Sequence, residues 1–210
     1  MAPRHPQQKS RLRAATTLLL AILTMFLATA CGTTPKTDTT PAPKPQPKTE
    51  KITYPAQFLY TYGFEKDLNG SRKAAKEFKD SGEFTDAYAT KNGDVIVIAT
   101  EKQRQNRIKV YDKWIEQGER GFQRESPDYR YEINQDGTAM TVWTDRHLSP
   151  KSSSGIFLLV PIGYGSKFYM TGHTGPWDMD ITIRNSHTSQ QVGHFKASQN
   201  INPDMNTFGD

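Results

Sequence analysis

The sequence contains very little cysteine: Cys31 is the only one among 210 residues. A single thiol excludes a disulfide within the chain, so the folded part must be held together by packing and hydrogen bonds. A lone cysteine also requires an explanation of its own if the chain is exported.

The chain also lacks a hydrophobic run long enough to cross a membrane. Its most apolar stretch, residues 14–27, is shorter than the roughly 20 residues that a spanning helix needs. The run follows a basic segment that holds Arg4, Lys9, Arg11 and Arg13. A basic segment followed by an apolar run of about 7 to 15 residues is typical of a signal peptide. We therefore predict a signal peptide over residues 1–30 and export of the rest.

No excess of either charge is found in the part of the sequence that can fold. Seven of the 27 basic residues but only two of the 22 acidic residues precede Lys51, so that 20 of each remain from Lys51 onward. A nucleic-acid-binding domain would carry its positive charge on the folded part. The sequence therefore predicts no nucleic-acid partner.

Signatures of common hydrolases are absent as well. The sequence has no G-x-S-x-G motif, no H-E-x-x-H motif and no serine followed three residues later by lysine. We assign no catalytic residue and predict a non-enzymatic protein without a cofactor.

The apolar run ends in Leu27-Ala-Thr-Ala-Cys-Gly32, and here the chain resembles the bacterial lipoproteins. Their lipobox consists of an aliphatic residue, two small residues and an invariant cysteine, although this chain has Ala28 where the family prefers leucine. The resemblance implies cleavage between Ala30 and Cys31 and a diacylglyceryl thioether on the Cys31 sulfur. The mature protein would then be lipid-anchored on the extracytoplasmic face of the cell membrane.

Ordinary cleavage by signal peptidase is the alternative, because Ala28-Thr-Ala30 also forms an A-x-A site. That reaction would release a soluble protein beginning at the same Cys31. Lipidation is favoured because it gives the unpaired cysteine a role. Acyl chains contribute about 0.8 kcal/mol per buried methylene, so two or three of them would hold the protein at the membrane.

Composition divides the remaining chain into three parts. Residues 31–50 are rich in threonine, proline and lysine and lack aromatic and branched aliphatic side chains, so this linker cannot bury a core. Its prolines favour an extended spacer. We predict a single domain over residues 51–196 and a polar tail over residues 197–210.

Local patterns predict helices and hairpins in alternation. A short helix over residues 71–80 should end at Gly82. Strands over residues 84–90 and 95–99 flank Asn92-Gly93, which favours a two-residue type I′ turn.

The most specific helix signal is the capping box Thr100-Glu-Lys-Gln103. The helix that it begins should bury the face that recurs at spacings of three and four, made by Ile108, Tyr111, Ile115, Gly118 and Phe122.

A second hairpin is predicted from residues 129–133 and 138–144. After a polar connection, residues 156–168 fit a helical period, with a buried strand over residues 156–161 as the alternative. Apolar and polar residues alternate over residues 177–185, which predicts a strand with one solvent-exposed face. Residues 190–195 are predicted as the last strand, antiparallel to it.

This succession predicts an α+β fold in which three hairpins form one antiparallel sheet, with two or three helices packed on one face. The order of elements is also similar to uncharacterised lipoproteins of Gram-positive bacteria, a resemblance that brings no known active site with it.

Imidazole and carboxylate side chains gather near the last hairpin, with Asp145 and His147 as further neighbours. Such groups can bind zinc or another divalent ion. The weak metal-ligand candidates are His173, Asp178, Asp180, His187 and His194. Asp178 and Asp180 share one strand face about 7 Å apart, which fits one ion or an ordinary solvated face.

Aromatic residues such as Tyr129, Trp143 and Trp177 are expected mainly in the core, where only an exposed ring would indicate a contact surface. We predict a membrane-anchored surface lipoprotein with a binding domain, whose partner is an envelope protein, a peptide or a cell-wall component. The alternative is a metal-binding domain or hydrolase that uses the histidine and aspartate residues.

Overall fold

The computed structural model describes residues 46–61, 63–145 and 147–199. Within this part, helices and strands alternate, and the predicted α+β class is confirmed. The elements in chain order are β1 (Thr49–Tyr54), α1 (Ala56–Thr61), α2 (Leu68–Asp80), β2 (Asp86–Ala89), β3 (Val95–Thr100), α3 (Glu101–Gln123), β4 (Arg130–Ile133), β5 (Ala139–Thr144), α4 (Pro150–Ser154), the π-helix η1 (Gly155–Leu159), α5 (Val160–Met170), β6 (Asp180–Asn185) and β7 (Gln191–Lys196).

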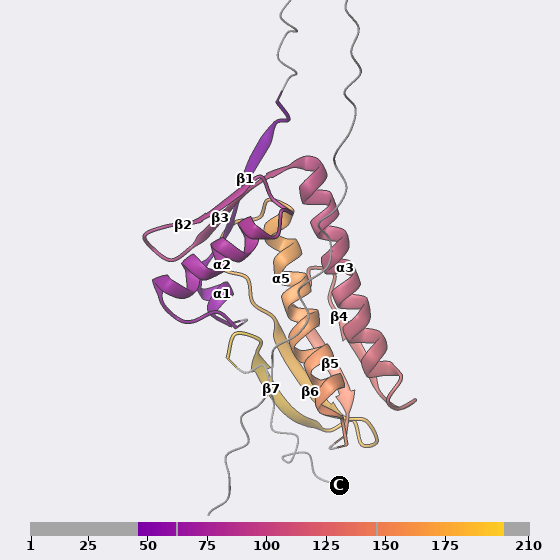
Figure 1. Cartoon of the computed structure of the whole chain (residues 1–210). Coiled ribbons are helices and arrows are strands. Elements are labelled where there is room, and N and C mark those ends of the chain that lie inside the picture. The colour runs from indigo at the N-terminus through magenta and orange to yellow at the C-terminus, as the bar shows by residue number, and fades with distance from the viewer. Residues whose placement is uncertain (1–45, 62, 146, 200–210) are drawn as a thin grey trace, which may run out of the picture. The chain divides into compact units, whose positions relative to one another are not determined.

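The strands form two sheets rather than the one that was predicted (Figure 1). The first sheet has the order β1-β3-β2 and is antiparallel, and the second has the order β4-β5-β6-β7. All three predicted hairpins form, but β5 and β6 pair in parallel. Parallel neighbours need a crossover connection, and residues 145–179, which contain α4, η1 and α5, supply it.

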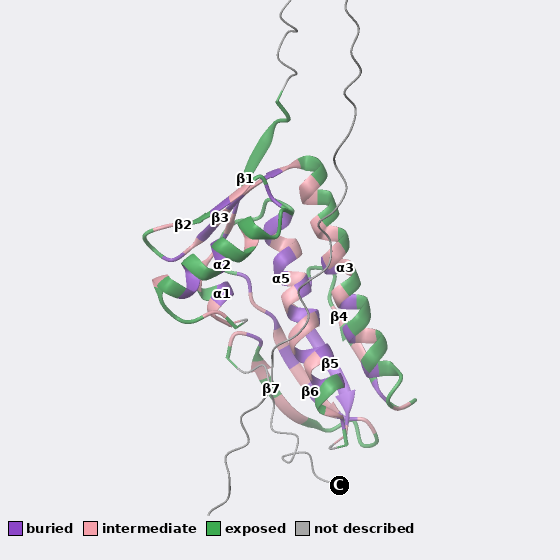
Figure 2. Ribbon diagram, in the orientation of Figure 1, coloured by how far each residue is buried: buried purple, intermediate pink, exposed green. Residues whose placement is uncertain are grey.

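The first sheet gains a strand that the sequence analysis did not assign. β1 pairs with β3 from Thr49↔Thr100 to Tyr54↔Val95, so the folded part begins before the predicted boundary at residue 51. The side chains of Ile52 and Tyr54 are buried, whereas Thr49, Glu50 and Lys51 are exposed (Figure 2).

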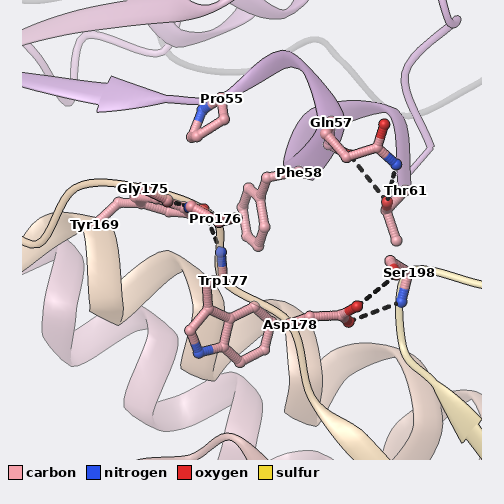
Figure 3. Close-up of a pocket in the computed structure, with 10 residues that line it drawn as sticks. All are labelled: Pro55, Gln57, Phe58, Thr61, Tyr169, Gly175, Pro176, Trp177, Asp178 and Ser198. Carbon is pink, nitrogen blue, oxygen red and sulfur yellow. Dashed lines mark hydrogen bonds between the residues drawn. The ribbon is translucent and has the colours of Figure 1, made fainter.

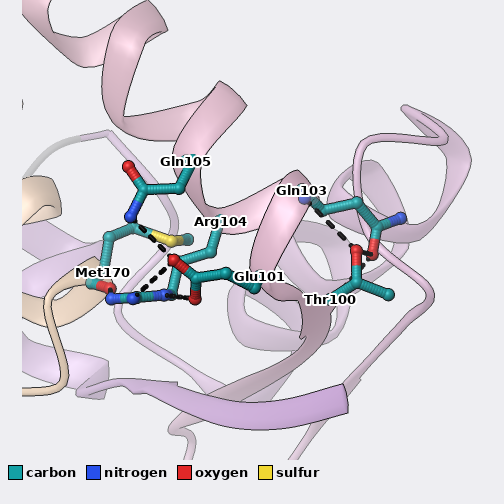
Figure 4. Close-up of polar contacts among 6 residues, drawn as sticks. All are labelled: Thr100, Glu101, Gln103, Arg104, Gln105 and Met170. Atoms are coloured by element: carbon teal, nitrogen blue, oxygen red, sulfur yellow. Dashed lines mark hydrogen bonds and ion pairs between the residues drawn. The ribbon is translucent and has the colours of Figure 1, made fainter. Parts of the chain in front are cut away.

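The start of α3 confirms the capping box. The Gln103 N–H donates to the Thr100 hydroxyl at 3.2 Å, and the Thr100 N–H donates to the Gln103 Oε1 at 2.8 Å (Figure 4). On the predicted apolar face, Tyr111, Ile115, Gly118 and Phe122 are buried and Ile108 is half-buried.

The turn between β2 and β3 differs from the predicted type I′ turn, which needs positive φ at both central residues. Gly93 has φ +87°, but Asn92 is not among the positive-φ residues. The Gly93 N–H donates to the Thr90 carbonyl, and Thr90 pairs with Asp94, so the loop has three residues with glycine in the left-handed position. This is the geometry of a type I turn followed by a bulge.

Residues 155–170 are helical, and the alternative of a strand over residues 156–161 is wrong. Between α4 and α5 the helix passes through the π-helix η1, in which the Val160 N–H donates to the Gly155 carbonyl. Pro161 has no N–H to donate to the Phe157 carbonyl, so the regular α-helical ladder cannot run through this point.

Glycines allow α3 and the η1–α5 helix to approach closely. A Cβ at Gly118 would lie 2.5 Å from the Gly155 carbonyl oxygen, and one at Gly163 would lie 2.5 Å from Ile115 Cγ1. The two helices therefore pack with their backbones almost in contact. In Figure 1 they run side by side along the second sheet.

Tyr54 is the point at which the first sheet meets the helices. Its ring stacks on Phe78 of α2 at 5.5 Å and meets Tyr169 of α5 edge-on at 5.8 Å. Its hydroxyl lies 3.1 Å from the hydroxyl of Tyr111 on α3. One continuous core therefore connects β1 with α2, α3 and α5.

Candidate functional site

A cavity of about 300 Å³ lies where α1, the end of α5 and the start of β6 meet (Figure 3). We call it the aromatic pocket. Its lining residues are Pro55, Gln57, Phe58, Thr61, Tyr169, Gly175, Pro176, Trp177, Asp178 and Ser198.

Three aromatic rings form the apolar side of the pocket. Phe58 meets Tyr169 at 5.1 Å and Trp177 at 6.1 Å, both edge to face. Gly165 of α5 makes room for this contact, because a Cβ there would lie 2.4 Å from the Phe58 ring and 2.5 Å from the Trp177 ring. Each ring is at most 7% exposed, so the wall is already packed in the absence of a ligand.

The Tyr169 hydroxyl fixes the loop that carries Trp177. It accepts a hydrogen bond from the Trp177 N–H and donates to the Gly175 carbonyl, each at 3.2 Å. Burial raises the pKa of Tyr169, so the phenol stays protonated and able to donate. The Trp177 Nε1 has no hydrogen-bond partner within the described residues, and Figure 3 shows it on the side of the ring away from Asp178.

Among the described residues that line the pocket, Asp178 is the one that carries a charge. Its Oδ2 accepts from the Ser198 hydroxyl at 2.6 Å, and its Oδ1 accepts from the N–H groups of Ser198 and Met179 at 3.0 and 2.9 Å. These bonds place a carboxylate beside an apolar wall (Figure 3). Such a site can receive a ligand that combines an apolar group with a positive charge or an N–H donor.

Ser198 lies in the segment that the sequence analysis assigned to a polar tail. The structure shows that Ala197 is fully buried and that Ser198 is bound to Asp178 from both its backbone and its side chain. The start of the predicted tail is therefore part of the folded domain.

The five candidate metal ligands do not converge on one point. The Asp178 carboxylate accepts a hydrogen bond from Ser198. The Asp180 Oδ1 instead lies 3.9 Å from the His194 Nε2 and 3.7 Å from the Lys196 Nζ. His173 stacks on Phe168 with ring centroids 4.7 Å apart. Within residues 46–61, 63–145 and 147–199, no three histidine, cysteine, aspartate or glutamate side chains are grouped to hold an ion.

The remaining candidate, His187, belongs to a separate polar cluster around Asp145. The Asp145 Oδ1 accepts from the Tyr129 hydroxyl at 2.6 Å and from the His147 N–H at 2.7 Å, and its Oδ2 lies 3.9 Å from the His187 Nε2. Partial burial of this carboxylate opposes its ionisation. The hydrogen bonds from Tyr129 and His147 outweigh that effect and lower the pKa of Asp145.

Sequence reasoning missed the part of the pocket that comes from β1 and α1. Ile52 and Tyr54 alternate as buried residues before Pro55, and this short pattern could have indicated the strand. Trp177 was singled out as an aromatic residue, but no sequence signal connected it with Phe58. The predicted lipidation and cleavage residues, Cys31 and Ala30, lie outside the described residues.

Comparisons of the chain with protein-family models, with curated proteins and with solved structures found no match. Among the described helices, none combines the length and the apolar character needed to cross a bilayer.

Proposed function

We propose that the chain is an exported lipoprotein, anchored through Cys31, whose domain binds a ligand of the cell envelope in the aromatic pocket. The observation that carries the binding role is the pocket itself, in which a packed aromatic wall lies beside one carboxylate. The signal-type segment before Cys31 and the proline-rich linker after it support the anchored location.

The pocket supports a binding role because its walls are fixed before any ligand arrives. Tyr169 holds the loop at Gly175 and Trp177, and Ser198 holds Asp178. A preformed site loses less conformational entropy when a ligand binds than a site that must first become ordered.

The chemistry of the lining selects the ligand. Apolar rings favour an aliphatic or aromatic group, and the Asp178 carboxylate favours a neighbouring ammonium or guanidinium group over an acid. A basic peptide, free or as part of an envelope protein or of the cell wall, satisfies both requirements.

Blocked basic peptides with one aromatic residue, and acidic peptides otherwise identical, test the binding role. They would be titrated into the full chain while the indole N–H signals are followed by NMR, with Trp177→Phe assigning the Trp177 signal. We expect the basic peptides to shift this signal. Asp178→Asn should weaken their binding by at least about tenfold, because a hydrogen bond to a charged group is lost.

Asp180→Asn is the matched control, because Asp180 does not line the pocket and its side chain is 48% exposed. Equal losses for the two variants, or equal binding of acidic and basic peptides, would contradict the proposed role of Asp178.

The anchor is tested by the mass of the mature N-terminus in membrane fractions, compared with Cys31→Ala. A diacylglyceryl group on Cys31, together with loss of membrane association in the variant, is the expected result. An unmodified Cys31 in the medium would establish the A-x-A cleavage instead.

A further inference from the structure

A second concave surface lies between the C-terminal half of α3 and the α4–η1 segment, apart from the aromatic pocket. It encloses about 650 Å³, and we call it the basic groove. Its lining residues are Gln117, Gly118, Arg120, Gly121, Arg124, Glu125, Lys151, Ser152, Gly155 and Leu159.

The floor of the basic groove is largely backbone. Gly118 and Gly155 bring α3 and η1 together so closely that neither could carry a larger side chain without displacement. Gly121, one turn further along α3, is exposed, and a Cβ there would meet nothing within 4 Å. The helices therefore touch at Gly118 and leave open space at Gly121.

The rim of the groove carries three cationic side chains, those of Arg120, Arg124 and Lys151. Arg120 is paired with Glu116 at 2.9 Å on the exposed face of α3. Arg124 and Lys151 form no ion pair within the described part of the chain, and both are exposed.

One acidic residue, Glu125, also lines the groove, but its carboxylate is already engaged. The Glu125 Oε1 accepts a hydrogen bond from the Ser149 N–H at 2.6 Å, which ties the end of α3 to the start of α4. A hydrogen bond from a neutral N–H leaves the charge of Glu125 in place, so the three cations and the one carboxylate give the lining an excess of two positive charges. The chain from Lys51 onward has no such excess.

We propose that the basic groove binds a phosphate-bearing polymer, with Arg124 and Lys151 contacting successive phosphate groups. The guanidinium fork matches phosphate oxygens in a bidentate manner, and the lysine ammonium adds a point charge. The open space above Gly121 admits a chain, whereas an enclosed site would admit only a single ion.

The position of the groove favours a polymer over the lipid surface. Thr49, through which the domain joins the linker, pairs with Thr100 at the beginning of α3. Residues 118–125 lie at the other end of this 23-residue helix, which spans roughly 35 Å at 1.5 Å per residue. The groove is thus remote from the point at which the domain is attached.

The first test measures binding of the full, processed chain to inorganic polyphosphate of defined length by isothermal titration calorimetry. We expect Arg124→Ala/Lys151→Ala to weaken binding by at least about tenfold, because two charge-assisted contacts are lost. The matched control is Lys109→Ala/Lys113→Ala, which removes the same charge from exposed positions of α3 outside the groove. An equal loss in both double variants would overturn the proposal, because it would show that polyphosphate responds to the total positive charge of the protein and not to the groove.

The second test fills the groove without changing its charge. Gly121→Leu places a side chain in the open space, and a substitution of glycine inside a helix does not weaken the helix. We expect this variant to stay folded and to lose polyphosphate binding by a similar factor. Undiminished polyphosphate binding by Gly121→Leu would show that the polymer does not bind in the basic groove.

Two further probes define the ligand class. Polyglutamate of equal charge should bind at least several-fold more weakly than polyphosphate if phosphate is recognised through the guanidinium fork, and equal binding would overturn the phosphate assignment. Vesicles of phosphatidylglycerol should not compete with polyphosphate. If the vesicles do compete, and if Arg124→Ala/Lys151→Ala removes the binding of the vesicles, the groove binds lipid headgroups. That result would overturn the proposal of a polymer ligand.

Discussion

The Arg104 guanidinium, on the first turn of α3, donates from Nη1 to the Met170 carbonyl at the end of α5 at 2.9 Å (Figure 4). The same side chain makes two hydrogen bonds to the Glu101 carboxylate, at 2.7 and 2.9 Å. Arg104 therefore satisfies a carbonyl that the helix itself leaves without a partner, and it joins the two helices that lie against the second sheet.

Arg104→Ala should destabilise the fold by about 1–2 kcal/mol, because a charge-assisted bond to a part-buried carbonyl is lost. Equilibrium urea unfolding measures the change. Arg120→Ala is the control, since its pair with Glu116 is exposed and should contribute at most about 0.5 kcal/mol. Equal effects of the two substitutions would show that the bond to Met170 adds nothing.

Two glycines of α3 should respond to alanine in opposite directions. Gly118→Ala places a Cβ 2.5 Å from the Gly155 oxygen, and such overpacking should cost about 1–3 kcal/mol. Gly121→Ala meets no neighbour, and higher helix propensity should stabilise the fold by about 0.5–1 kcal/mol. Thermal unfolding of both variants tests the close approach of α3 and η1, which would be refuted if Gly118→Ala were neutral.

Tyr129→Phe should make the free energy of unfolding less dependent on pH in the acid range. Hydrogen bonds from Tyr129 and His147 hold the native pKa of Asp145 below its usual value, despite the opposing effect of burial. This carboxylate therefore contributes stability above its unfolded pKa of about 3.9, and the contribution is lost as the pH falls through the lower native value. Without the phenol, the native pKa rises towards the unfolded one.

Urea unfolding of wild type and Tyr129→Phe between pH 2 and pH 7 measures this effect. The difference in unfolding free energy between the two proteins should be largest at pH 7, where Asp145 is ionised. It should shrink in acid, as the pH falls through the lowered native pKa of Asp145. A difference that stays constant with pH would mean that the hydroxyl acts independently of the charge of Asp145.

The hydroxyls of Tyr54 and Tyr111, 3.1 Å apart in the core, should act as a coupled pair. Burial and the neighbouring Tyr111 raise the pKa of Tyr54, so the Tyr54 phenol is protonated at neutral pH. Each single change to phenylalanine leaves a buried hydroxyl unpaired and should cost about 1–2 kcal/mol. The double variant should lose less than the sum of the two, and strict additivity in unfolding measurements would show that no bond exists.

The sequence predicted those features that depend on neighbours along the chain. The capping box at Thr100 and Gln103 and the buried face of α3 depend on residues within a few positions of one another, and both are confirmed. The π-helix was not predicted, although Gly155 and Pro161 explain it afterwards. The type I′ turn was wrong because a glycine in the second position is compatible with more than one turn.

The sequence could not predict the features that depend on pairing between distant segments. Thr49 has little apolar character around it, and only its pairing with Thr100 makes it part of a strand. The aromatic pocket unites Phe58, Trp177 and Ser198 from both ends of the domain, and no spacing rule connects them. The candidate metal ligands are separated for a related reason, because nearness in sequence did not bring Asp178, His187 and His194 together.

The parallel pairing of β5 with β6 also determines the order in which the chain can complete its second sheet. During synthesis from the N-terminus, β5 emerges with β4, and its other edge stays open until residues 145–179 and then β6 have followed. An open strand edge is a template for wrong pairing, and distant pairing is slow to form. The crossover that completes the native sheet therefore leaves the free edge of β5 exposed to wrong pairing until β6 has followed.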